Sequence, residues 1–170
     1  PQSGVYVEKP TIDESIEVVT FDISDGKVEA WYLPVEAQGP GIIIAHGNQG
    51  VIDKNIDLAR MLNKLGLQVL LIEYPSYGRS TGTLKQENFL ACFTQGFDFL
   101  RAKTEVSSVV VYGSSMGGSV AGYLLKNRKP DALILRSCFI NFGEFVAKRF
   151  FLPKQIINNA FLNQTLIESY

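Results

Sequence analysis

The rhythm of apolar and polar positions changes along the chain after residue 34. Residues 17–23 and 27–33 alternate apolar with polar side chains, and Asp25 and Gly26 stand between them. This pattern predicts an antiparallel hairpin closed by a type I′ turn. Four later runs, residues 41–45, 68–73, 107–112 and 132–135, are apolar without alternation. Such runs are typical of strands buried on both faces of a parallel sheet.

Segments with helical spacing separate these runs. Residues 53–65 and 84–101 repeat apolar side chains every three or four positions, and residues 116–126 form a stretch of small residues. Alternating strands and helices indicate βαβ units with right-handed crossovers. We therefore predict an α/β fold, with a mainly parallel central sheet flanked by helices and the N-terminal antiparallel hairpin at one edge.

The carboxyl ends of the four runs predict where a site would lie. Ligands of open α/β sheets bind outside this edge. The segments that follow the runs are residues 46–48, 74–80, 113–117 and 137–138, and they are rich in Gly, Ser and Tyr. We expect them to meet at one edge of the sheet.

Composition and charge exclude several classes of protein. The 170 residues suit one domain, and 46% hydrophobic with 19% charged residues excludes a disordered chain. Balanced charges, 16 Lys+Arg against 17 Asp+Glu, argue against a nucleic-acid partner. No apolar run approaches the length of about 18 residues that a membrane span needs. Because the sequence begins with Pro1 rather than Met, the question of a leader or membrane anchor upstream is left open, and no compartment is assigned.

A G-x-S-x-G motif stands at Gly113, Ser115 and Gly117. It follows a predicted buried strand and opens a predicted helix, which is the setting of a nucleophile elbow. The alternative is a glycine-rich turn that packs a helix on a sheet. In an elbow, two backbone N–H groups hold the oxyanion, and here they would belong to Met116 and Asn48. A nucleotide site is not indicated, since the segment lacks the Lys of a P-loop.

Four segments, residues 42–48, 73–80, 112–118 and 133–138, resemble the Bem46-like serine hydrolases of the α/β-hydrolase superfamily. The resemblance extends over residues 18–145. It implies hydrolysis of a small-molecule ester, thioester or amide, with Ser115 as nucleophile, Asn48 and Met116 as oxyanion donors, and no metal or cofactor. Glu73 departs from the Asp that is frequent in the family, and we expect little consequence because this carboxylate is not in the triad.

The acid and the histidine of a triad are missing after Ser115. The single histidine of the chain, His46, precedes the serine, and the resemblance favours a structural role for it over that of a base. Asp131 precedes its strand and should lie at the wrong edge, and Glu144 is a poor candidate. We expect acid and histidine to come from outside these 170 residues, which alone would be inactive. The alternative is a non-catalytic α/β-hydrolase-like binding or assembly module.

Residues 1–136 are expected to form the hydrolase core, and residues 137–170 the start of a cap or a helical tail. The aromatic tail would be a lid for a hydrophobic acyl chain or a core helix without its partners. The last strand would keep an open edge, covered by a missing C-terminal segment or a partner protomer. Residues 77–80 would line the substrate mouth or pack under the elbow. Cys92 is expected in the core, and Cys138 to pack rather than react.

Overall fold

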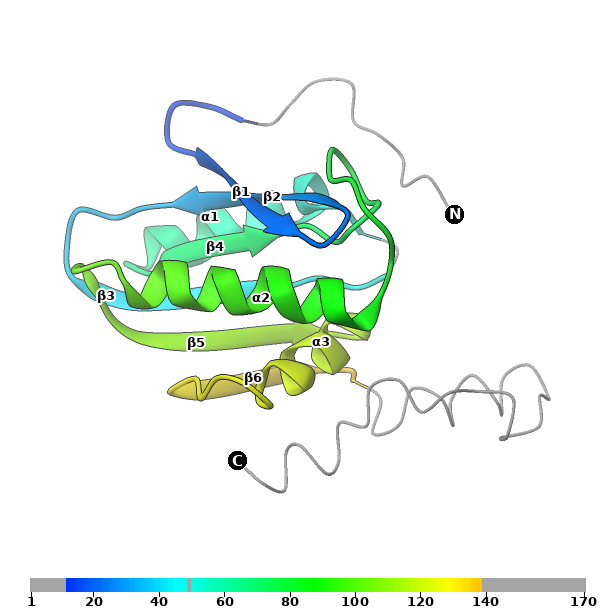
Figure 1. The fold of residues 1–170 in the computed structure, drawn as a ribbon. Coiled ribbons are helices and arrows are strands. Elements are labelled where there is room, and N and C mark those ends of the chain that lie inside the picture. The colour runs from blue at the N-terminus through cyan, green and yellow to red at the C-terminus, as the bar shows by residue number, and fades with distance from the viewer. Residues whose placement is uncertain (1–11, 49, 139–170) are drawn as a thin grey trace.

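The structure, a computed structural model, describes residues 12–48 and 50–138. They form a six-stranded sheet, and helices cover both of its faces (Figure 1). The strands are β1 (Glu17–Ile23), β2 (Gly26–Leu33), β3 (Gly39–Ala45), β4 (Gln68–Ile72), β5 (Val106–Ser114) and β6 (Ala132–Arg136). The helices are α1 (Ile56–Lys64), α2 (Gln86–Arg101) and α3 (Met116–Leu124), and the short 3₁₀ helix η1 (Ile52–Asn55) precedes α1.

The strand order is β1-β2-β4-β3-β5-β6. Strands β4, β3, β5 and β6 are parallel, while β2 runs antiparallel to both β1 and β4. The predicted fold class is confirmed: a mainly parallel α/β sheet with an antiparallel hairpin at one edge.

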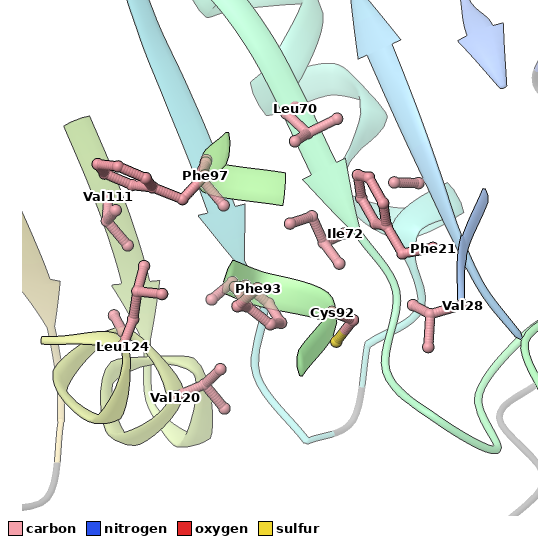
Figure 2. Close-up of a cluster of buried hydrophobic side chains, with 14 of the residues drawn as sticks. Phe21, Val28, Leu70, Ile72, Cys92, Phe93, Phe97, Val111, Val120 and Leu124 are labelled. Carbon is pink, nitrogen blue, oxygen red and sulfur yellow. The ribbon is translucent and has the colours of Figure 1, made fainter. Parts of the chain in front are cut away.

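Each face of the sheet carries its own apolar cluster, which explains the uninterrupted apolar runs. Ile43 of β3 packs with residues of α2 and α3, whereas Ile42 and Ile44 pack with residues of α1 on the other face. The larger cluster brings together side chains of β1, β2, β4, β5, α2 and α3 (Figure 2). Alternate residues of the central strands thus serve opposite faces, and both faces need apolar side chains. Cys92 is fully buried in the larger cluster, as predicted.

The expected helices differ from the observed ones mainly at their ends. The helix expected over residues 53–65 begins as η1 and continues as α1, and Gly66 then ends it with φ at +89°. Its N–H donates to the Asn63 carbonyl at 2.9 Å, so the predicted glycine cap is confirmed. The other two helices begin or end two residues inside the expected ranges.

The predicted type I′ turn is wrong. Ile23 pairs with Gly26, so the two loop residues are Ser24 and Asp25, and neither Asp25 nor Gly26 has the positive φ that this turn requires. A Cβ at Gly26 would lie 2.5 Å from the Gly82 nitrogen. Gly26 is therefore explained by the close approach of a distant loop, not by its own turn.

The last strand is also less buried than its apolar run indicated. Residues of β6 alternate between exposed and half-buried, and Ile134 is 48% exposed. Within residues 12–48 and 50–138, β6 pairs with β5 alone. The expected cap or tail at residues 139–170 lies outside the described residues. No helix in the described ranges is both long and apolar enough to cross a membrane.

Asp25 should make the fold sensitive to acid. The Thr83 hydroxyl donates to its carboxylate and lowers the pKa of Asp25 to about 2 from the ordinary 3.8. A carboxyl whose pKa is lowered on folding stabilises the protein above its unfolded pKa, and this contribution is lost as pH falls through the folded pKa. We expect Asp25→Asn to lower the melting temperature at pH 7. The difference in melting temperature between the parent and Asp25→Asn should be smaller at about pH 2.5. Glu36→Gln, at an exposed loop residue, is the control. If the melting temperature of Asp25→Asn differed from that of the parent by the same amount at both pH values, the prediction would be contradicted.

Candidate active site

Ser115 occupies a strained backbone conformation where β5 ends and α3 begins. Its φ is 53° and its ψ is −116°, a region that residues with a side chain rarely adopt. Such strain costs on the order of 1–3 kcal/mol and persists only where the surroundings impose it. Here the Ser115 N–H donates to the Arg136 carbonyl at 2.9 Å, and the Gly118 N–H donates to the Ser115 carbonyl at 3.0 Å. The backbone is therefore held on both sides of the turn.

The two motif glycines are required by close packing around this turn. A Cβ at Gly117 would lie 2.0 Å from the Ala45 carbonyl oxygen, and one at Gly113 would lie 2.6 Å from the Gly117 carbonyl oxygen. Helix α3 thus begins directly against the end of β3. The packing explanation of these glycines holds, but it does not account for the positive φ of Ser115, which Ser76 and Ser137 share and which agrees with the strained strand-to-helix turn of an elbow.

The loop after β3 lies beside the elbow. A Cβ at Gly47 would be 3.7 Å from the Ser115 Cβ. Asn48 is exposed, and its side-chain oxygen accepts a hydrogen bond from the Tyr77 hydroxyl at 2.6 Å. Met116 is the first residue of α3, where helical N–H groups lack an intrahelical acceptor. The structure therefore brings the loop that carries Asn48 to the serine that precedes Met116; the roles of these three residues stay predictions.

His46 and Glu73 form a buried pair beneath that loop. Their side chains are 0% and 1% exposed, and the His46 Nε2 lies 2.8 Å from the Glu73 Oε1. The other ring nitrogen, Nδ1, lies 2.9 Å from the Gly47 carbonyl oxygen. The ring also packs on Tyr74, with ring centres 4.1 Å apart. The partners of both nitrogens are thus Glu73 and the Gly47 carbonyl, an arrangement that favours a structural role for His46.

Two tyrosines after β4 hold the same loop. The buried Tyr74 hydroxyl donates to the His46 carbonyl, and Tyr77 reaches Asn48. Burial and then the Glu73 charge raise the pKa of both tyrosines, so both remain protonated donors at neutral pH. Arg79 turns away to Glu29, with contacts of 2.7–2.9 Å. Of residues 77–80, Tyr77 thus faces the predicted site, while Arg79 packs against β2.

The sequence places residues 74–80 at this edge and offers residues 77–80 for the substrate mouth, but the sequence analysis gives Glu73 and Tyr74 no individual part in the site. The only expectation for Glu73 is that it lies outside the triad. An available signal was the carboxylate itself, which directly follows the apolar residues 69–72 and has a tyrosine after it. Buried carboxylates need hydrogen-bond donors, so its partners had to come from neighbouring segments.

The remaining candidates have structural explanations. Asp131 accepts a hydrogen bond from the Val109 N–H at 2.7 Å, which lowers the pKa of Asp131, and it pairs with Arg101 at 2.8 Å. It therefore lies at the opposite edge, as predicted. The Cys138 Sγ packs where a Gly118 Cβ would stand, and burial raises the pKa of this thiol, which opposes thiolate reactivity. Glu144 lies outside the described residues, among which no three His, Cys, Asp or Glu side chains could together hold a metal ion.

Comparison with known proteins agrees with this architecture. The family profile described as alpha/beta hydrolase fold matches residues 40–139, and the chain belongs to this family. It is 34% identical over 148 residues to the alpha/beta hydrolase domain-containing protein WAV2 of Arabidopsis thaliana, which covers 80% of the chain and 48% of WAV2. It is 32% identical over 153 residues to the lysophosphatidylserine lipase ABHD12 of Rattus norvegicus, which covers 82% of the chain and 38% of that protein. The chain thus spans less than half of each of these two relatives.

Solved structures show the same fold. The alpha-beta hydrolase from Vibrio vulnificus superimposes with a TM-score of 0.74 at 18% identity, covering 91% of this chain and 60% of that one. At this identity the likeness establishes the fold alone.

Proposed function

We propose that the chain is part of a Bem46-like serine hydrolase that cleaves a carboxylic ester, thioester or amide. Ser115 is the nucleophile, and the N–H groups of Asn48 and Met116 form the oxyanion hole. The observation that carries this proposal is the strained Ser115 backbone, at φ 53°, beside the Gly47 loop. Strain of this kind is concentrated at functional sites.

The proposed reaction is acyl transfer in two steps. The Ser115 Oγ attacks the carbonyl carbon while a base takes its proton, and the carbonyl oxygen becomes an oxyanion held by the two N–H groups. The nine-residue helix α3 points its positive end at this oxyanion. The intermediate then expels the alcohol, thiol or amine, which takes up the proton, and water releases the acid from the acyl-serine by the same route.

The base and its acid come from outside these 170 residues. The single histidine is already bound to Glu73 and lies in the loop that would form the oxyanion hole. In this fold the triad acid and histidine follow the serine along the chain. A segment beyond the described residues, or a partner protomer, would supply them and cover the exposed β6 edge. No metal or cofactor takes part in this proposal.

The substrate is proposed to be an ester or thioester with a hydrophobic acyl group. Two observations support this choice: the aromatic composition of residues 139–170, and the name of the relative ABHD12, a lysophosphatidylserine lipase. Amides remain within the proposed reaction class, since the same oxyanion hole serves them.

The test is intact-mass spectrometry of the protein, purified as it occurs and treated with a fluorophosphonate. We expect one phosphonate adduct on Ser115, together with polypeptide mass beyond the 18.8 kDa of this chain. Ser115→Ala should lose the adduct completely. Ser114→Ala is the matched control and should keep it, because Ser114, unlike Ser115, has no glycine two residues before or after it.

Two results would contradict the proposal in different ways. An adduct on a lone 18.8 kDa chain would overturn a further polypeptide segment as the source of the base and leave a partner protomer or His46. No adduct on the folded protein would overturn the hydrolase and favour a non-catalytic binding or assembly module. The engagement of the single histidine with Glu73 is the observation that favours this second candidate.

A further inference from the structure

Glu73 contacts both ends of the loop that carries Asn48. Its Oε1 accepts hydrogen bonds from the His46 Nε2 at 2.8 Å and the Tyr74 N–H at 2.9 Å. Its Oε2 accepts a hydrogen bond from the Ile52 N–H at 3.0 Å. His46 and Ile52 flank residues 47–51, so one carboxylate holds the entry and the exit of this loop.

The Glu73 carboxylate is deeply buried and well supplied with donors. The residue is 0% exposed, and a buried carboxylate is tolerated only where hydrogen bonds and charge compensate for lost water. Charge-assisted hydrogen bonds are roughly twice as strong as neutral ones. The Glu73 bonds therefore orient the loop more strongly than contacts at an exposed surface would.

The length of the Glu73 side chain allows this double contact. An aspartate would carry its carboxylate on a side chain shorter by one C–C bond, about 1.5 Å. Gly78 leaves the space that the longer side chain needs, because a Cβ there would lie 2.8 Å from the Glu73 Oε2. The departure from aspartate, expected to matter little, thus coincides with a space shaped for glutamate.

We propose that Glu73 is the positioning residue of the oxyanion hole. Glu73 acts on the Asn48 N–H through His46 and Ile52, and Tyr74 and Tyr77 of the same segment complete the support. The catalytic part of this inference rests on the proposed function. The structural part, control of the conformation of residues 47, 48, 50 and 51, does not depend on it.

The first variant is Glu73→Gln, which keeps the side-chain length but replaces one acceptor oxygen by an NH₂ donor. Either the His46 ring or the Ile52 N–H then loses its acceptor. Because a misplacement of about 1 Å near a reacting group can cost about 100-fold in rate, we expect fluorophosphonate labelling of Ser115 to slow by about 10- to 100-fold. Glu73→Asp, the milder variant, keeps the charge but loses reach, and its labelling rate should fall between Glu73→Gln and the parent.

Gln68→Ala is the matched control. Gln68 begins β4, the strand that Glu73 directly follows; it is 0% exposed and bonds to Tyr32, Val35 and Ala37 at the opposite edge. Its loss should lower the melting temperature at least as much as Glu73→Gln, yet leave the labelling rate within about twofold of the parent, since additivity holds for distant sites. If Glu73 only stabilised the fold, the labelling rate would fall in both Glu73→Gln and Gln68→Ala, in proportion to the loss of melting temperature in each.

A second measurement follows the conformation of the loop and does not require the protein to be active. Hydrogen exchange of the backbone N–H groups of residues 47–51 should accelerate in Glu73→Gln and stay unchanged in Gln68→Ala. The single histidine makes the His46 ring N–H signal in an NMR spectrum unambiguous, and this signal should shift in both Glu73 variants.

These readouts separate the two proposals. If the parent protein does not label, the proposed function fails, and faster exchange of residues 47–51 still supports the hold of Glu73 on the loop. If the parent labels but both Glu73 variants label at its rate, the positioning role is overturned. Unchanged exchange in Glu73→Gln would overturn it as well.

Discussion

Gly117→Ala is expected to disrupt the elbow and to reduce labelling of Ser115 by about 100-fold or more, because a shift of about 1 Å at a reacting group has that effect. The added Cβ would lie 2.0 Å from the Ala45 carbonyl oxygen and 2.7 Å from that of His46. Both are backbone atoms, so no side-chain rotation relieves the overlap. Helix α3 must move away from β3, and Ser115 moves with it. Overpacking of this kind costs about 1–3 kcal/mol or more, which chemical denaturation would measure.

Gly96→Ala is the control for this experiment. Gly96 is also a buried helical glycine, but its added Cβ would meet the Ile72 Cδ1, at 2.3 Å, which is the end of a flexible side chain. The gain in helix propensity, about 1 kcal/mol, offsets the repacking of Ile72. We expect a change in stability within about 1 kcal/mol and an unchanged labelling rate. If Gly117→Ala behaved like Gly96→Ala in both measurements, the close approach of α3 to β3 would not be what requires glycine.

The strands and helices of the fold could be predicted because each apolar run has a direct physical cause. Ile42, Ile43 and Ile44 are all apolar because neighbouring residues of β3 serve opposite faces of one covered sheet. The hairpin turn was mispredicted for the opposite reason. Asp25 forms hydrogen bonds with Thr83 and Asn88, about sixty residues away in the chain. Rules for turns use neighbouring residues only, so they do not include the contacts that decide its conformation.

The candidate site could be predicted only as far as the edge of the sheet on which it lies. The Gly113–Ser115–Gly117 spacing indicated a nucleophile elbow, and the φ of 53° at Ser115 agrees with the strained turn of an elbow, while the role of Ser115 stays a prediction. The contact between Glu73 and His46 depends on which strands are neighbours in the sheet. Strands β3 and β4 are adjacent and parallel, with Ile44 opposite Leu71, and this register places His46 next to Glu73. Apolar patterns mark strands but carry no information about strand order, so this pair could not be found from the sequence.

His46→Leu is expected to lower the free energy of unfolding by about 3–5 kcal/mol, the usual cost of removing one partner from a buried pair. The variant leaves the Glu73 carboxylate without its His46 donor at a position that is closed to solvent in the parent. The packing of the imidazole on Tyr74 is lost as well. Urea denaturation, followed by far-ultraviolet circular dichroism, measures the change.

A double-mutant cycle separates the charge from the packing. In His46→Leu with Glu73→Gln, the carboxylate is replaced by a neutral amide, which needs less compensation when buried. The double variant should therefore be more stable than the sum of the two single effects, by about 0.5–3 kcal/mol, the range found for groups in direct contact. Two results would contradict the claim that the buried pair holds the loop after β3. They are additive effects in the cycle, or a decrease in the free energy of unfolding below about 1 kcal/mol for His46→Leu alone. A positive result would locate the stability of this loop in the contact between His46 and Glu73, at the point where β3 and β4 end side by side.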